Sequence, residues 1–296
     1  MRNNRILSFG LVTLLGLSGV CLAGCGGRIS QLSDASSPIV TVGNTNIKKG
    51  DAYNRLMKIA GGYTAVSDAK SVISNAEIPD SDEINETATS AMNNYKLQMG
   101  DRFNTYLETI GMTEEEYLSD VLIPSIKNSK LAEKYVTDNI DDVTGRFHPV
   151  LASIITVNSE SAAENAAKAL ADDSADPSSV ASDNGGTYTA DAVVVTDHVS
   201  DSNTVYDSAV RDYLKSGDAS NAWTTVDGSN GSYYVVKKSD TAVTSENAAA
   251  IAADTDVTSE AMQYYFKKYN FEVYDSSLYN QIKETSPDYL VQDSKK

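Results

Sequence analysis

The sequence of 296 residues contains little cysteine, little histidine and few aromatic side chains other than tyrosine. Its two cysteines, Cys21 and Cys25, both lie near the N-terminus, which excludes an internal disulfide framework and a cysteine-based zinc site. The two histidines, His148 and His198, are far apart in the chain. This scarcity of ligands and bases argues against a zinc hydrolase and a Ser-His-Asp enzyme, and we expect neither a metal nor a cofactor.

Basic side chains are also scarce. The chain has 24 Lys and Arg against 41 Asp and Glu, a formal net charge of −17. Because phosphate binding depends on neutralisation by Lys and Arg, this balance argues against nucleic acid as a partner. Hydrophobic residues make up 41% of the chain, which is enough to form a core, and the length suits two ordinary domains or one large one.

The N-terminus has the pattern of an export signal. An apolar run from Ile6 to Ala23 follows two arginines, and it ends in the tetrapeptide Leu-Ala-Gly-Cys at residues 22–25. This motif resembles a bacterial lipobox and predicts that residues 1–24 are a lipoprotein signal peptide. Cys25 would then become the mature N-terminus, with an S-diacylglycerol and an N-acyl chain. The alternative is a transmembrane anchor, for which a run of about 18–20 residues is barely long enough.

A lipidated Cys25 would attach the chain to a bilayer, because several acyl chains anchor more firmly than one. Residues 25–37 are small and polar and predict a flexible tether. No later segment is apolar enough to span a membrane, so the rest of the chain is expected in water outside the cell.

Two segments, 38–145 and 240–290, have helical periodicity, with apolar side chains three and four residues apart. A short strand pair is expected before the first helix. Gly100 is expected to interrupt the apolar stripe that runs from Met92 to Ile110. Thr113 to Glu116 are expected to form a capping box, and Pro124 is expected to kink the helix that follows. We interpret the stripes as core packing. Their members before residue 145 include Tyr53, Leu56, Ile59, Ala60, Met92, Tyr95, Met99, Phe103, Tyr106, Leu107 and Ile110.

Between these segments, residues 146–239 predict a small α+β domain, and residues 291–296 a tail. The expected elements are a buried strand at 150–157, a helix capped at Ser161, a strand at 192–196, a helix at 206–215, and a hairpin of strands 223–226 and 233–237 around Asp227-Gly228. The predicted fold class is therefore α+β, with a mainly helical part split by this middle domain.

With this layout, the chain resembles the PrsA foldase family, the lipid-anchored extracytoplasmic folding factors of Gram-positive bacteria. The resemblance covers nearly the whole chain. It depends on the lipobox and on three segments, 39–47, 103–116 and 267–278, which are similar to the family's opening segment, its "GMTEEE" helix junction and its C-terminal "kkaNVkIkDkdL". It implies a discontinuous helical chaperone domain with an inserted parvulin-type peptidyl-prolyl isomerase domain, on the outer face of the cytoplasmic membrane.

The residues that the resemblance assigns to catalysis are replaced in this sequence. Parvulins resemble one another in a histidine on the first strand, a second on the last strand, and Met and Phe around the proline pocket. Ser153 and Tyr234 occupy the two histidine positions, and residues 148–239 contain neither Met nor Phe. Because X-Pro isomerisation must cross a barrier of about 18–20 kcal/mol, we expect no efficient catalysis. His148 and His198 are expected to be exposed polar residues that do not restore it.

The function implied is a membrane-anchored foldase or chaperone that binds unfolded or newly secreted proteins in an apolar cleft of the helical domain. A second copy of the chain is a further candidate partner. Three alternatives remain open: an active parvulin-type isomerase on the same architecture, a solute-binding lipoprotein, and a structural surface protein. Too few strands for two α/β lobes count against the second, and the absence of sequence repeats counts against the third.

Overall fold

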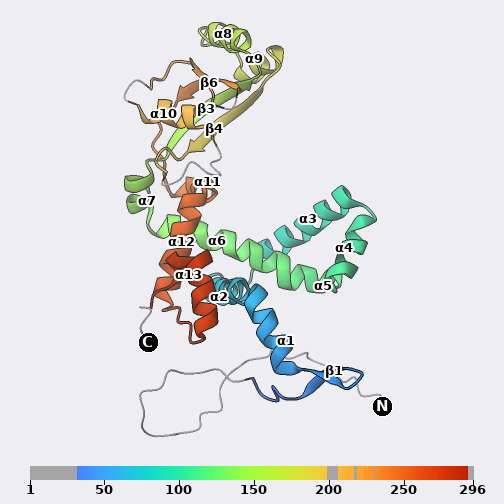
Figure 1. Cartoon of the computed structure of the whole chain (residues 1–296). Coiled ribbons are helices and arrows are strands. Elements are labelled where there is room, and N and C mark those ends of the chain that lie inside the picture. The colour runs from blue at the N-terminus through green and yellow to red at the C-terminus, as the bar shows by residue number, and fades with distance from the viewer. Residues whose placement is uncertain (1–31, 199–205, 217–218, 230, 293–296) are drawn as a thin grey trace, which may run out of the picture.

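The computed structural model describes residues 32–198, 206–216, 219–229 and 231–292. The predicted signal peptide and Cys25 lie outside these residues, as does most of the predicted tail. The structure confirms the α+β class, with a mainly helical chain and two small antiparallel sheets (Figure 1). Within the described residues, no helix is both long enough and apolar enough to cross a membrane.

The chain begins with an exposed hairpin and a long helical run (Figure 1). The two hairpin strands pair antiparallel through a turn at Gly43, whose φ of +59° suits glycine. The helical run extends from Lys49 to Glu77 and contains a π-helical turn. The elements are β1 (Pro38–Val42), β2 (Thr45–Lys48), α1 (Lys49–Leu56), η1 (Met57–Gly61) and α2 (Gly62–Glu77).

Two glycines let this run approach the C-terminal helix α13 (Ser276–Thr285) closely. A Cβ at Gly61 would lie 2.6 Å from a methyl carbon of Leu278, and a Cβ at Gly62 would lie 2.9 Å from Cβ of Gln281. The Gln281 side chain also accepts a hydrogen bond from the Gly62 backbone N–H at 3.1 Å. Segments more than 200 residues apart in sequence therefore pack directly against each other.

A projecting group of helices follows, with its own apolar cluster (Figure 1). Gly100, at φ +54°, separates its first two helices as predicted, and Thr113 forms the predicted capping box with Glu116. Pro124 lies within a continuous helical run and directly follows a π turn, which accommodates its missing N–H. The elements are α3 (Asp82–Met99), α4 (Arg102–Ile110), α5 (Glu114–Tyr117), η2 (Leu118–Leu122) and α6 (Ile123–Asp138).

Helix α6 is the centre of the largest core. Its residues Leu131 and Val136 are fully buried among side chains from α2 and from the C-terminal helices, including Ile251, Tyr265 and Phe266. We call α1–α7 and α11–α13, with the short turns η1–η4 that join them, the helical body. The remaining elements of the body are α7 (Ile140–Phe147), η3 (Ser245–Asn247), α11 (Ala248–Ala252), α12 (Thr255–Lys268) and η4 (Pro287–Tyr289).

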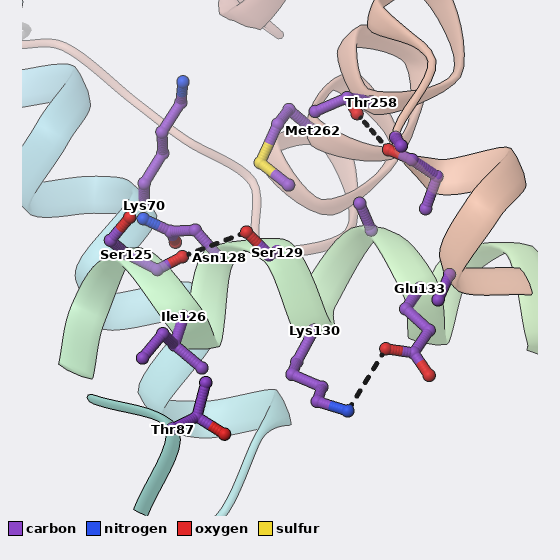
Figure 2. A pocket seen from close by; sticks show the side chains of 14 residues that line it. Lys70, Thr87, Ser125, Ile126, Asn128, Ser129, Lys130, Glu133, Thr258 and Met262 are labelled. Carbon is purple, nitrogen blue, oxygen red and sulfur yellow. Dashed lines mark hydrogen bonds and ion pairs between the residues drawn. The ribbon is translucent and has the colours of Figure 1, made fainter. Parts of the chain in front are cut away.

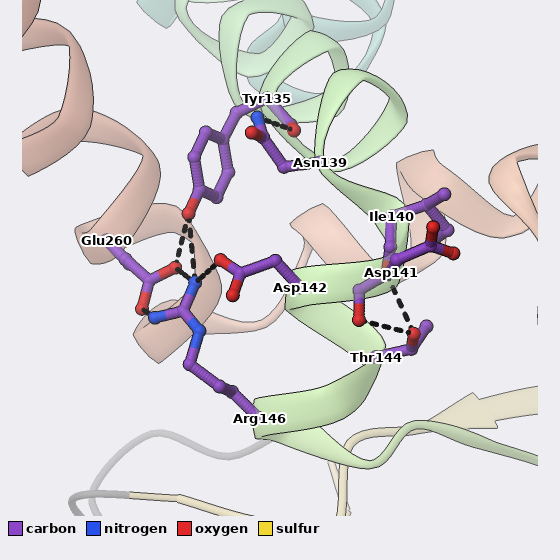
Figure 3. A network of polar contacts seen from close by, with 8 residues as sticks. All are labelled: Tyr135, Asn139, Ile140, Asp141, Asp142, Thr144, Arg146 and Glu260. Carbon is purple, nitrogen blue, oxygen red and sulfur yellow. Dashed lines mark hydrogen bonds and ion pairs between the residues drawn. The ribbon is translucent and has the colours of Figure 1, made fainter.

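A polar network fixes α7 where the chain leaves the helical body (Figure 3). The Tyr135 hydroxyl donates to Glu260 at 2.5 Å, and Arg146 bonds to Glu260 and, at 2.7 Å, to Asp142. Burial and the bond to Glu260 raise the pKa of Tyr135 to about 12, so this hydroxyl stays protonated at neutral pH. The network thus ties α6, α7 and α12 together.

Residues 150–238, which we call the sheet unit, form a four-stranded antiparallel sheet in the order β4-β3-β6-β5. Helices α8 and α9 cover one face and α10 the other, each over its own apolar cluster. The cap of α8 is Ser159, not the expected Ser161, and β4 begins five residues earlier than expected. The elements are β3 (Val150–Val157), α8 (Glu160–Ala169), α9 (Pro177–Asp183), β4 (Thr187–Val194), α10 (Ser208–Lys215), β5 (Thr224–Asp227) and β6 (Tyr233–Lys238).

The interpretation of the apolar stripes as core packing is wrong for the stripe from Tyr53 to Ala60. It is half right for the second stripe, from Met92 to Ile110. Tyr53, Leu56 and Ile59 are exposed, whereas Met92, Phe103 and Leu107 are buried. Tyr95, Tyr106 and Ile110 of the second stripe are exposed as well. Helical periodicity places side chains on one face, but only a packing partner buries that face.

The pairing of the two halves of the helical body predicts a pH-dependent stability. Glu77 of α2 accepts hydrogen bonds from Lys268 and from the Tyr269 hydroxyl, and the bond from Lys268 holds the pKa of Glu77 below its usual value of 4.5. Because the pair is partly exposed, Glu77→Gln should lower the free energy of unfolding by about 0.5–1 kcal/mol near pH 7. A lowered pKa stabilises above the unfolded pKa, so the difference should vanish as the pH falls below 4.5. Urea unfolding curves measure it.

The exposed Glu86 of α3 supplies the matched control. Glu86→Gln should leave the stability unchanged at both pH values. An equal loss in the two variants, or a Glu77→Gln loss that persists in acid, would contradict the assignment.

The expected domain limits predict that the helical body folds without the sheet unit. Removing residues 148–239 spares Phe147, which belongs to the helical core, but deletes Val195, which also packs there. With a short Gly-Ser link, the remaining chain should still unfold cooperatively, at a lower temperature than the parent. Calorimetry of the excised chain and of the isolated unit tests this. Non-cooperative melting of the excised chain together with an unfolded isolated unit would instead indicate one continuous core.

Candidate functional site

Two adjacent hollows meet at α6 of the helical body. The first has a volume of about 660 Å³ and lies between α6 and the α11–α12 region, and Lys70 and Thr87 also line it (Figure 2). Ile126, Ala252 and Met262 make its wall largely apolar. Helix α6 places these contacts because Ser125, Asn128, Ser129 and Glu133 are left partly uncovered, whereas Lys127 and Leu131 of the same helix are buried.

The second hollow, of about 690 Å³, lies between η1–α2 and α13. Ile59, Val66 and Tyr289 contribute apolar surface. Lys70 and Asn128 line both hollows, so the two are adjacent, and we call them together the α6 groove.

The groove contains polar side chains where its two hollows meet. The side-chain Oδ1 of Asn128 is buried and has no hydrogen-bond partner among the described residues. Lys70 lies beside it, with its Nζ 5.1 Å from the centre of the Tyr289 ring. A buried amide oxygen without a partner is costly, so a bound group that donates a hydrogen bond would be favoured here.

An exposed apolar row continues from the second hollow. Leu56, Ile59 and Tyr63 share one face of the α1–η1–α2 run and are 66%, 74% and 81% exposed. Ile59 and Tyr63 also line the groove. Sequence reasoning found two members of this row but assigned them to the core, because periodicity is the same for a covered and an uncovered face.

A smaller hollow of about 280 Å³ lies in the sheet unit beside Ser153. The Tyr188 hydroxyl donates to Ser153 Oγ at 3.4 Å, and Tyr188 and Trp223 form an aromatic pair with ring centres 6.4 Å apart. Asp191, at φ +46°, also lines this hollow, and the β3–β4 register shifts at Ser153. The absence of Met and Phe from residues 148–239 gave no sign of this Tyr–Trp pair, which gives the hollow an aromatic wall.

The two positions assigned to catalytic histidines do not come together. Ser153 pairs with Lys237, whereas Tyr234 pairs with Thr156, three residues further along β3. Since side chains alternate between the faces of a strand, Ser153 and Tyr234 lie on opposite faces of the sheet. Tyr234 is buried in the apolar cluster under α10. The hollow beside Ser153 therefore contains no histidine and no second residue of the assigned pair.

The two histidines have different environments. His148 is exposed as expected, with Nδ1 2.5 Å from Asp197. The expectation that His198 is exposed is wrong, because its side chain is only 2% exposed and lies beside Asp254 and Asp256. Among the described residues, this trio is the one group of three or more side chains that could hold a metal ion. Nothing in the local sequence around His198 indicated that the start of α12 would cover it.

Comparisons with known proteins give matches among solved structures only. No family model and no curated protein matches the chain. Among solved structures, the foldase protein PrsA from Streptococcus pneumoniae str. Canada MDR_19A is 14% identical, with a TM-score of 0.46, over 86% of this chain and 100% of that one. The peptidylprolyl isomerase PrsA from Bacillus cereus is 18% identical, with a TM-score of 0.42, over 86% and 100%.

PrsA from Bacillus subtilis is 17% identical, with a TM-score of 0.38, over 86% of this chain and 99% of that one. Each of these three solved structures is a PrsA foldase or a PrsA peptidylprolyl isomerase.

The composition of the Ser153 hollow predicts little isomerase activity. We expect the chain to accelerate isomerisation of a proline peptide no more than about twofold over the slow uncatalysed exchange, because nothing is placed to favour the twisted amide. A protease-coupled peptide assay, run beside an active parvulin, measures it.

Three variants give this assay a clear outcome. Tyr234→Phe changes the opposite face of the sheet and is the control for Ser153→Ala. A rate comparable with that of the active parvulin, lowered by Ser153→Ala or Trp223→Ala but not by Tyr234→Phe, would identify a divergent active site.

Proposed function

We propose that this protein is a membrane-anchored extracytoplasmic foldase of the chaperone type, which holds unfolded segments of newly secreted proteins in the α6 groove. The observation that carries the proposal is the pair of hollows joined at Lys70 and Asn128 and extended by the exposed row at Leu56, Ile59 and Tyr63. A groove of this kind suits a chain that has not yet buried its own apolar side chains.

The chemistry of the groove matches what an unfolded segment offers. Ile59 and Tyr63, which are exposed, supply apolar contacts, which favour binding by roughly 25 cal/mol per Å² of apolar surface removed from water. The unpaired Asn128 Oδ1 suits a backbone N–H of the bound segment. Binding must also overcome the entropy of ordering a disordered chain, so the affinity is expected to be modest and the release fast.

The anchor and the charge fit the same role. The predicted lipid on Cys25 would hold the protein at the outer face of the cytoplasmic membrane. The residues before Asp34 would act as the tether, because Ala35 and Ser37 accept backbone hydrogen bonds from Gly50 and Lys49. The net charge of −17 would keep the helical body away from an anionic surface and available to clients.

An isomerase working on the same architecture is the second candidate. The observation that favours it is the aromatic pair of Tyr188 and Trp223 beside Ser153, which could contact a proline ring. The antiparallel pairing of all strands among the described residues speaks against a solute-binding protein with two α/β lobes.

The proposal predicts that the exposed row is needed for chaperone activity. The double variant Ile59→Ser/Tyr63→Ser removes two apolar contacts at the groove edge. About fivefold more protein should be needed to delay aggregation of an unfolded client equally, which corresponds to about 1 kcal/mol of lost binding. Light scattering of a diluted, denatured client measures the delay.

The control is Val72→Ser/Leu97→Ser, two substitutions at side chains that are 66% and 82% exposed but line neither hollow. This variant should protect as well as the parent, and the melting temperatures of all three proteins should agree. Equal loss in both double variants, or full activity of Ile59→Ser/Tyr63→Ser, would contradict the assignment of the groove.

A further inference from the structure

His198 connects the sheet unit to the helical body through buried polar contacts. It follows β4, whereas its partners Asp254 and Asp256 lie at the start of α12. The side chains of the three residues are 2%, 6% and 17% exposed. This contact lies outside the α6 groove and outside the Ser153 hollow, and neither proposed activity uses it.

Both ring nitrogens of His198 face hydrogen-bond acceptors. Nδ1 is 3.2 Å from the Asp256 carboxylate, and Nε2 is 3.0 Å from the Val195 carbonyl oxygen and 3.4 Å from the Asp254 carboxylate. A neutral imidazole carries one N–H, so one nitrogen would face an acceptor without a proton between them. The imidazolium, which donates from both nitrogens, satisfies all of these neighbours.

The two carboxylates gain from this charge in different ways. Asp254 also caps α12 by accepting the backbone N–H groups of Asp256 and Val257. Burial raises the pKa of Asp254, and the charge of His198 opposes that rise. Asp254 and Asp256 approach opposite ring nitrogens, an arrangement that suits a double donor better than one metal ion held by all three side chains.

The other charged and titratable groups around His198 come from α10 and the adjoining chain. Arg211 and Tyr206 line the same hollow of about 170 Å³, and Arg211 is buried. Asp197, the preceding residue, is directed at His148 and Lys215. Among the described residues, the carboxylates that face His198 itself are therefore those of Asp254 and Asp256.

We propose that His198 is a protonation-dependent latch that fixes the sheet unit against the helical body. In the protonated state, its two N–H groups hold the start of α12. When it loses its proton, one of these bonds is replaced by a contact between two acceptors, and the latch weakens. The remaining contacts, such as the Thr196 N–H to the Phe147 carbonyl oxygen at 3.2 Å and Val195 in the helical core, keep the unit attached but less well oriented.

The orientation of the sheet unit should therefore loosen as the pH rises. The test uses the full mature chain, residues 25–296, with Cys25→Ser, which removes its one cysteine. Dyes on Ser161→Cys of α8 and Lys283→Cys of α13, both exposed, report the distance between unit and body by single-molecule energy transfer (Figure 1). The distribution should be narrow at pH 6.0, and its width should grow about threefold by pH 8.5.

The second histidine supplies the control. His148→Gln should keep the pH-dependent change, because His148 is exposed and does not contact α12. His198→Gln should give a broad distribution at both pH values, and Asp256→Asn, which leaves the histidine in place, should shift the change to lower pH. Near-ultraviolet circular dichroism verifies that each variant is folded.

Three results would overturn the latch. The parent distribution could be independent of pH, or the change could persist in His198→Gln. Alternatively, EDTA could broaden the distribution at pH 6.0 and zinc could restore it, which would show that a metal ion holds the cluster. Because the readout is a distance and involves no client, none of these results bears on the α6 groove.

Discussion

The burial of α6 is the constraint on which the rest of the structure depends. Leu131 and Val136 reach zero exposure only because helices from both ends of the chain, α2 on one side and α11–α12 on the other, cover them together. Neither end could form this core alone. The chain must therefore leave the helical body after α7 and return to it before α11, and the sheet unit is formed by the residues in between. The Tyr135–Glu260–Arg146 network fixes the point of departure.

The same arrangement explains the α6 groove. Helices that pack against α6 leave Ser125, Asn128, Ser129 and Glu133 partly uncovered, and the hollow lies along these residues. Lys70 and Asn128 add a charge and an unpaired amide oxygen beside apolar side chains such as Ile126 and Ile59. In the function proposed above, this mixture would suit transient contact with many apolar segments better than tight binding of one ligand.

The sheet unit combines a well-packed architecture with a polar hollow. Two apolar clusters, one on each face, make its four strands and three helices stable elements. The hollow beside Ser153 instead contains a hydroxyl pair, an aromatic wall and several charges. A unit of this kind can orient or extend a binding surface without performing chemistry, and the buried contact of His198 with α12 makes that orientation a function of its protonation.

Sequence alone was sufficient for several features that depend on neighbouring residues. The Thr113 capping box, the break at Gly100, the strand at 150–157 and the closing hairpin follow from hydrogen bonds and periodicity within a few residues. Three features of the candidate sites required the tertiary structure. Leu56 and Ile59 are exposed because no helix packs on their face, Ser153 and Tyr234 are separated by strand register, and His198 is buried by a helix more than fifty residues away in the chain. Each depends on contacts between distant segments, and periodicity carries no information about which distant segment will cover a given face.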